Sequence, residues 1–206
     1  MDVTIVGEDR ATKEVITRLI NHIGGIQIFR ELPARGGKIK SLLNNFNLLS
    51  TIQPVILLTD LDQYSCPPEL LTNWFQRLPR NENFHVRVAV DEAEAWLMAD
   101  REGFSQHFNI PLEYIPKSVA RSRIRPDQNE MNFPYKSSLY LIREIVPHSR
   151  TKSIRESLQP SGGSNKGPLY NSTITKFIKN IWNIENACEN SYSLRKTIFR
   201  LETLRT

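Results

Sequence analysis

Residues 55–62 read Val-Ile-Leu-Leu-Thr-Asp-Leu-Asp, and this stretch decides the class of fold. Its first four residues form a continuous apolar run, which is typical of a parallel strand that helices bury on both faces. Asp60 and Asp62 follow at once, so the strand is predicted to end beside two carboxylates that are one residue apart. A strand of this kind requires neighbouring strands and covering helices elsewhere in the chain.

Suitable elements flank the run on both sides. Apolar runs predict strands at residues 3–6, 26–29 and 84–90, and helical spacing predicts helices at 15–23, 42–49, 67–78 and 93–98. Strands that alternate with helices of this length indicate βαβ units. We therefore predict an α/β fold with a mainly parallel, four-stranded sheet and helices on both of its faces.

The second half of the chain has a different pattern, because strand signals disappear after Asp100. Residues 109–135 contain four prolines and three arginines, which predicts a long basic loop. Apolar spacing then predicts helices at 139–146, 151–158, 170–182 and 192–204. We expect residues 1–108 to form the α/β domain, and residues 109–206 to form a basic loop and a C-terminal helical extension packed on it.

Charge is divided unevenly between the two halves. The chain of 206 residues has a formal net charge of +5. Residues 1–100 hold 13 acidic and 10 basic residues, whereas residues 101–206 hold 9 acidic and 17 basic residues. Acids gathered for chemistry and bases gathered for a polyanion would produce this division, and so would an ordinary solvated surface.

Composition also excludes several classes of protein. A hydrophobic content of 39% and a charged content of 24% argue against disorder, collagen and coiled coil. No apolar run approaches the length of a membrane span, and the N-terminus lacks the features of a signal peptide. Cys66 and Cys188 provide neither a disulfide framework nor a zinc site. We expect a cytoplasmic protein with no membrane partner.

Acidic clusters follow three of the predicted strands, at residues 8–9, 60–62 and 91–94. The carboxyl ends of parallel strands share one sheet edge, where ligands bind. Carboxylates are the ligands that Mg²⁺ or Mn²⁺ prefers, and such a site is suited to phosphodiester cleavage. We count Glu92 and Glu94 among the candidate metal ligands. The alternative is that these acids only complement the dipoles of the helices that follow, and the sequence leaves both explanations open.

Several motifs carry a resemblance to a known family. Asp60-Leu61-Asp62 resembles the DxD motif of TOPRIM-fold proteins, and residues 3–20 resemble their first motif. Residues 88–100, 167–171 and 191–195 are similar to a family of uncharacterised bacterial TOPRIM-like proteins with an OLD-nuclease-like domain. The similarity covers the full length of the chain, although only Asp60-x-Asp62 bears directly on chemistry.

The resemblance implies a TOPRIM/Rossmann-like fold and a nuclease that uses a metal-activated water. Asp60 and Asp62 would be metal ligands, and Glu8 would be a ligand or a general base. TOPRIM proteins usually place the first glutamate immediately before the glycine, where this chain has Val6, and Glu8 instead follows Gly7. Relatives of this kind are often encoded beside ABC-type ATPases in arrangements that suggest defence against phage. The implied partner is therefore an ATPase subunit.

Basic residues supply candidates for binding nucleic acid. We expect Arg121, Arg123, Arg125 and Lys166 to contact phosphates without reading sequence, although a solvated surface explains them too. Lys136 is a candidate for neutralising the charge that develops during phosphodiester cleavage. Residues 35–38, Arg-Gly-Gly-Lys, are a weaker candidate for a backbone phosphate cradle.

The leading interpretation is a nuclease that depends on Mg²⁺ or Mn²⁺ and acts as the effector subunit of an ATPase-partnered, anti-phage system. The alternative is a non-catalytic docking or sensor subunit with a degenerate acidic site. A nucleotide phosphotransferase is a third reading, which the lack of a phosphate-loop motif weakens. The sequence leaves open the choice between DNA and RNA, and whether the chain forms a homo-oligomer.

Overall fold

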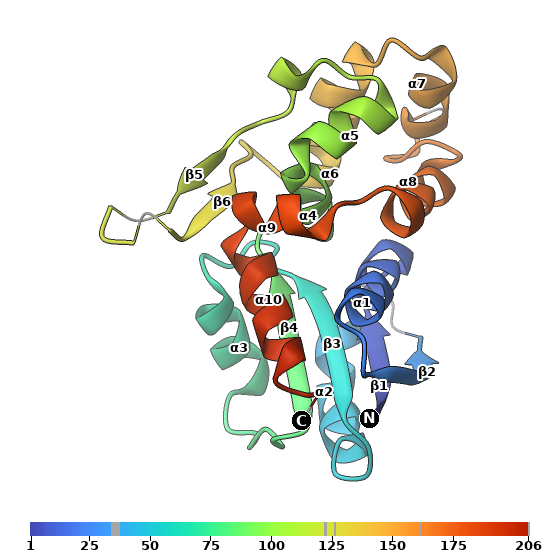
Figure 1. Cartoon of the computed structure of the whole chain (residues 1–206). Coiled ribbons are helices and arrows are strands. Elements are labelled where there is room, and N and C mark those ends of the chain that lie inside the picture. The colour runs from blue at the N-terminus through green and yellow to red at the C-terminus, as the bar shows by residue number, and fades with distance from the viewer. Residues whose placement is uncertain (34–37, 122, 126, 161, 206) are drawn as a thin grey trace. The chain divides into compact units, whose positions relative to one another are not determined.

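The computed structural model describes residues 1–33, 38–121, 123–125, 127–160 and 162–205 (Figure 1). Its contacts divide the chain into two compact units. The first, which we call the sheet unit, comprises Met1–Val90 and Lys196–Thr206. The second, which we call the helical unit, is Asp91–Arg195.

The sheet unit is built on four parallel strands in the order β2-β1-β3-β4. The strands are β1 (Asp2–Gly7), β2 (Gln27–Leu32), β3 (Val55–Asp60) and β4 (Phe84–Ala89). The first five residues of β3 are buried, as the apolar run predicts. The predicted α/β fold with a four-stranded parallel sheet flanked by helices is therefore confirmed.

Three helices connect these strands: α1 (Arg10–Ile23), α2 (Ile39–Leu49) and α3 (Pro67–Phe75). A capping box fixes the start of α1, in which the Asp9 carboxylate accepts from the N–H of Thr12 and the Thr12 hydroxyl accepts from the N–H of Asp9, both at 2.9 Å. Gly24, with φ of 70°, ends the helix. The capped turn follows Gly7 directly and so sets the path of the loop that carries Glu8.

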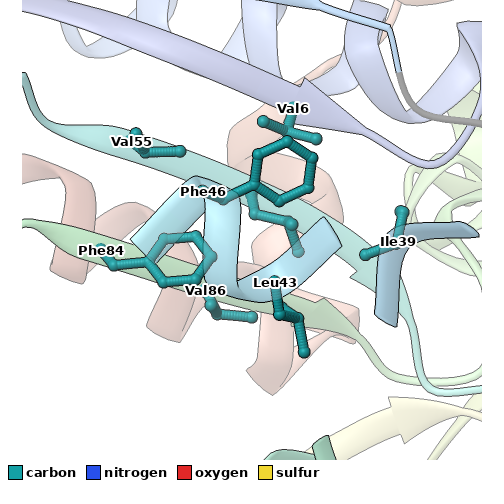
Figure 2. Close-up of a cluster of buried hydrophobic side chains, with 8 residues drawn as sticks. Val6, Ile39, Leu43, Phe46, Val55, Phe84 and Val86 are labelled. Carbon is teal, nitrogen blue, oxygen red and sulfur yellow. The ribbon is translucent and has the colours of Figure 1, made fainter. Parts of the chain in front are cut away.

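One face of the sheet packs against α2 in a cluster of buried side chains, which Figure 2 shows. The strands contribute Val6, Val55, Leu57, Phe84 and Val86, and the helix contributes Ile39, Leu43 and Phe46. Because strand residues alternate between faces, Ile5 and Ile56 point to the opposite face, where α1 packs against β1 and β3. The central strands β1 and β3 are thus buried on both sides, and their ends remain for function.

The helical unit contains mostly short helices. They are α4 (Ala93–Ala99), α5 (Arg101–Phe108), α6 (Ser137–Tyr140), α7 (Lys152–Leu158), α8 (Tyr170–Asn180) and α9 (Ile184–Asn190). Between them lie the 3-10 helix η2 (Leu112–Tyr114), the π-helical turn η3 (Leu141–Ile145) and the 3-10 helix η4 (Val146–His148). The last helix, α10 (Tyr192–Glu202), begins in this unit and ends in the sheet unit.

The stretch that we expected to be a basic loop contains a small antiparallel hairpin, formed by β5 (Ser118–Ala120) and β6 (Asn129–Met131). Our expectation that strands disappear after Asp100 was therefore wrong at this point. Strands of three residues are too short to show a periodic pattern, and this pair depends on remote contacts. The amide of Asn129 donates to the backbone oxygen of Glu189 at 2.7 Å, and the hydroxyl of Ser118 donates to the side chain of Asn190 at 2.9 Å.

Within the described part of the chain, no helix has the length and apolar character that crossing a bilayer requires.

Candidate active site

The sheet unit brings its first two acidic clusters to one edge. Glu8 follows β1, Asp60 ends β3, and these two strands are adjacent, with Gly7 opposite Leu58. The carboxylate of Glu8 accepts a hydrogen bond from the hydroxyl of Thr59 at 3.2 Å and a longer one from the N–H of Asp60 at 3.5 Å. The parallel sheet thus places Glu8 directly beside the start of the Asp60-x-Asp62 motif.

Asp62, two residues after Asp60, acts on Glu8 through its charge. Burial raises the pKa of Glu8 above its ordinary value, and the negative charge of Asp62 raises it further. The hydrogen bonds from Asp60 and Thr59 act in the opposite direction and lower the pKa. Because Glu8 and Asp62 repel one another, a cation between them would relieve an unfavourable interaction.

Asp62 has an unusual backbone conformation. Its φ is 52°, in the left-handed region that few residues other than glycine adopt, and its side chain is exposed. Aspartate tolerates this region better than most residues because its short side chain can form local hydrogen bonds. The turn after β3 therefore presents the second aspartate of the motif toward solvent rather than into the core.

The donor chemistry at this edge fits a magnesium or manganese ion. Carboxylate oxygens suit both metals, and Mg²⁺ in proteins usually keeps several waters and uses only one or two carboxylates. In the described part of the chain, no group of three or more His, Cys, Asp or Glu residues is arranged to hold a metal. Glu8, Asp60 and Asp62 therefore offer a partial set of ligands, and metal binding by them remains a prediction.

The third acidic cluster belongs to the helical unit, where it caps α6. Asp91 accepts a hydrogen bond from the N–H of Ser137 at 3.0 Å, and Glu92 accepts one from the N–H of Ser138 at 2.7 Å. The ammonium group of Lys136 lies 3.6 Å from the other oxygen of Glu92. These acids therefore stabilise the first turn of a helix that lies far along the chain, in addition to preceding α4.

Glu94 is the most deeply buried of the predicted metal ligands, with 4% of its surface exposed. Its carboxylate accepts from the hydroxyl of Tyr170 at 2.8 Å and pairs with the ammonium group of Lys166 at 3.3 Å. Lys166 also lies over the ring of Tyr170, 4.4 Å from its centroid. Lys166 and Lys136, predicted to contact phosphates and to assist cleavage, are thus both placed against buried glutamates. Those predicted roles stay predictions.

The three arginines predicted to contact phosphates all lie in the turn between β5 and β6, and all are exposed. Arg121 is at the base of the hairpin, where its N–H donates to the backbone oxygen of Gln128 at 3.2 Å. Arg123 and Arg125 flank Ile124, whose side chain is 90% exposed. The hairpin therefore carries an apolar side chain between two cations at its tip.

Glu130, in β6, is a buried carboxylate that the sequence analysis missed. Its two oxygens accept from the N–H of Ser193 at 2.5 Å and from the hydroxyl of Ser191 at 2.7 Å, at the start of α10. Ser193 in turn accepts from the indole N–H of Trp96 at 2.8 Å. Burial raises the pKa of Glu130, while these serine hydrogen bonds and the charge of Arg121 oppose that shift. The glutamate lies in a stretch that we expected to be a loop, so no local pattern marks it.

Of the remaining candidates, residues 34–37 lie outside the described part of the chain, so the predicted phosphate cradle at residues 35–38 has no structural account. Comparison with known proteins found no matching family model, no matching curated protein and no matching solved structure. Functional inference therefore rests on the geometry of the chain's own residues. That geometry joins Glu8, Asp60 and Asp62 at one edge of the sheet unit.

Proposed function

We propose that the chain is a nuclease that hydrolyses phosphodiester bonds in DNA or RNA and uses Mg²⁺ or Mn²⁺ as its cofactor. The supporting observation is the approach of Glu8 to the Asp60-x-Asp62 motif at the carboxyl edge of two adjacent parallel strands. The repulsion between Glu8 and Asp62 is consistent with a site that needs a cation.

Within this proposal, Asp60 and Asp62 hold the metal, and Glu8 acts as a ligand or as the general base. A bound divalent ion would supply Lewis acidity and lower the pKa of a water molecule. Burial and the charge of Asp62 raise the pKa of Glu8, which makes its carboxylate a better proton acceptor. The hydroxyl of Thr59 orients that carboxylate toward the strand end.

The exposed arginines of the hairpin would bind the phosphate backbone, since guanidinium groups contact phosphates without regard to sequence. The family resemblance supports a further part of the proposal: a cytoplasmic effector subunit that works with an ABC-type ATPase in defence against phage. Co-purification of the tagged chain with its genomic neighbours checks this part. Recovery of an ATPase subunit would support the assembly, and recovery of the chain alone as a monomer would contradict it.

A non-catalytic docking or sensor subunit is the second candidate function. One observation favours it: the Glu8 carboxylate already accepts hydrogen bonds from Thr59 and from the N–H of Asp60. These contacts give Glu8 a structural purpose, because they join the ends of two strands whether or not a metal binds. In this reading the acids are remnants of a site and the chain contributes a surface.

A cleavage assay separates the two functions. The purified protein is incubated with plasmid, single-stranded DNA and RNA in Mg²⁺ or Mn²⁺, beside an Asp60→Asn/Asp62→Asn variant. A Glu82→Gln variant is the matched control, because Glu82 is exposed and precedes β4, at the amino ends of the strands rather than at their carboxyl ends. If the chain is a nuclease, the parent and the control should cleave nucleic acid only when metal is present. The double variant should not cleave under either condition.

A second measurement does not depend on turnover. Isothermal titration calorimetry with Mn²⁺ should detect binding to the parent and the control but not to the Asp60→Asn/Asp62→Asn variant. Circular dichroism of all three proteins establishes that the variants are folded. Equal background cleavage and equal Mn²⁺ binding in all three would reject the nuclease and favour the docking subunit.

A further inference from the structure

The turn between β5 and β6 carries an exposed apolar side chain that the proposed nuclease does not use. Ile124 is 90% exposed. A single exposed isoleucine is ordinary on a protein surface, and Ile52 in the sheet unit is 85% exposed. Ile124 differs in its setting, because it lies between the exposed residues Arg123 and Arg125 in the turn of a two-stranded hairpin. Figure 1 shows this hairpin extending away from α5 and α6 of the same unit.

The hairpin and its turn are positively charged. Residues 117–128 contain four basic residues and one acidic residue, so their formal net charge is +3. The four basic residues, Lys117, Arg121, Arg123 and Arg125, are all exposed. A surface of this charge attracts polyanions, and on nucleic acids it gains affinity by displacing condensed counterions. Charge complementarity therefore favours a partner with a dense array of phosphates.

The base of the turn is held in place before any partner binds. The guanidinium group of Arg195 donates to the backbone oxygens of Asp127 at 2.6 Å and Cys188 at 3.0 Å, which joins the hairpin to α9. The N–H of Gln128 donates to the backbone oxygen of Arg125 at 3.1 Å. These bonds add to the contacts of β5 and β6 with α9 described above. A turn anchored in this way loses less conformational entropy on binding.

The kind of side chain in the turn narrows the choice of partner. Proteins that hold single strands stack the bases on aromatic rings, whereas the exposed apolar residue here is isoleucine. Segments that lie in a membrane surface present a broad apolar face, whereas Ile124 has an arginine on each side. An aliphatic side chain beside arginines is the combination that wedges between base pairs of duplex DNA from the minor groove.

We propose that the hairpin inserts Ile124 between two base pairs of duplex DNA from the minor groove, while Arg123 and Arg125 bind on either side of it. The inserted side chain unstacks one base step and kinks the duplex. Pyrimidine–purine steps such as TA unstack most easily, so the preferred site contains such a step. This inference rests on the nucleic-acid binding in the proposed function, and it is independent of cleavage.

Two fluorescence measurements on DNA test the wedge. A short duplex carries 2-aminopurine at one TA step, and the fluorescence of this base rises when it is unstacked. A second duplex carries a donor and an acceptor dye at its ends, so that a kink raises the energy transfer between them. Both are titrated with the whole chain in EDTA, which prevents any metal-dependent cleavage. We expect the parent to raise both signals.

Ile124→Ser is the decisive variant, because it removes the wedge and leaves every charge in place. We expect it to abolish both signals and to weaken duplex binding about tenfold, since burial of the isoleucine is partly offset by the cost of unstacking. The slope of log affinity against log salt should stay that of the parent. Ile124→Leu, which keeps an aliphatic side chain, should restore both signals. Ile52→Ser is the matched control and should behave as the parent.

Other results would overturn the proposal. Equal signals from the parent and Ile124→Ser would show that another residue distorts the duplex. Binding without either signal would show that the hairpin contacts phosphates alone. The same chain is mixed with an RNA duplex, single-stranded DNA and vesicles of anionic lipid in separate arms. Binding to any of these without binding to the DNA duplex, or binding to none of the four, rejects the wedge.

The outcome is separable from that of the nuclease assay. The Asp60→Asn/Asp62→Asn variant keeps the hairpin and should raise both fluorescence signals as the parent does. Unstacking without metal-dependent cleavage would reject the nuclease and keep the wedge. Cleavage without unstacking would reject the wedge and keep the nuclease.

Discussion

The carboxylate of Glu8 accepts a hydrogen bond from the hydroxyl of Thr59 at 3.2 Å, across the ends of strands β1 and β3. This contact lowers the pKa of Glu8, against the effects of burial and of Asp62 that raise it. Thr59 therefore helps to keep Glu8 ionised and oriented. A substitution at Thr59 can remove this hydroxyl and leave the carboxylates of the site in place.

Replacement of Thr59 by valine should raise the pKa of Glu8 and destabilise the fold by about 1 kcal/mol, the usual net value of one hydrogen bond. Thr59→Ser keeps the hydroxyl and is the matched control. Urea unfolding measures the free energy of unfolding of each variant, and the nuclease assay measures its activity. If Thr59→Val matched Thr59→Ser in both, the hydroxyl would have no such role.

Stability should fall in mild acid because of His85. Its pKa in the folded protein is about 4, compared with an ordinary value of 6.5. Between these two values the unfolded chain binds a proton that the folded chain does not, so the free energy of unfolding decreases as the pH falls from 6.5 toward 4. His85→Gln should reduce this dependence, as measured by urea unfolding at pH 7.5 and pH 5, whereas the same change at exposed His22 should preserve it.

Glu130→Ala should destabilise the helical unit by about 1–3 kcal/mol, because it leaves the buried N–H of Ser193 and the hydroxyl of Ser191 without their acceptor. The indole N–H of Trp96 donates to the hydroxyl of Ser193, and Trp96 provides a fluorescence signal for the unfolding measurement. A loss no larger than that of a surface substitution such as Glu113→Ala would contradict this assignment.

The same position has a defined pH dependence. Burial raises the pKa of Glu130 above its ordinary value of 4.5. The folded chain therefore holds a proton that the unfolded chain has released, and the free energy of unfolding decreases as the pH rises from 4.5 through the folded-state pKa. Glu130→Gln, which cannot ionise, should flatten this part of the profile. A profile identical to that of the parent would show that Glu130 is not its source.

The hairpin arginines should differ in effect. Arg123→Ala and Arg125→Ala should each weaken nucleic-acid binding and reduce the slope of log affinity against log salt by about 0.9, if each side chain contacts one phosphate of a duplex. The charge of Arg121 lowers the pKa of half-buried Asp91 and of buried Glu130, against the effect of burial, so Arg121→Ala should mainly reduce stability. Fluorescence anisotropy of a labelled duplex at several salt concentrations checks the slopes. Identical slopes for all three variants would refute the distinction.

Sequence patterns predicted the sheet because β1, β3 and β4 contain apolar residues that nearby helices bury, whereas β2 has no buried residue. The central strand is the clearest example, since residues 55–58 are apolar and buried in β3. The sequence also predicted that Glu8 lies close to Asp60, because the carboxyl ends of adjacent parallel strands share one edge of the sheet. In both cases the relevant information lies in local periodicity and in a general rule of topology.

Local sequence patterns could not predict which residues form hydrogen bonds with Glu92 and Glu94. Glu92 contacts Ser138, and Glu94 contacts Tyr170, across separations of 46 and 76 residues. The hairpin of β5 and β6 depends in the same way on Asn129 reaching Glu189, 60 residues away. Contacts of this range are set by how the short helices pack, and no property of the local sequence determines that packing.

Helix α4 has one further consequence. All seven of its residues, Ala93–Ala99, are buried, so this helix presents no side to water. An amphipathic helix accepts neutral substitutions on its solvent-exposed face. In α4, however, a new side chain at any position would contact the residues packed around the helix. In a saturation mutagenesis map, the segment should therefore stand out as an uninterrupted block of intolerance, and lineages of this protein should diverge elsewhere first.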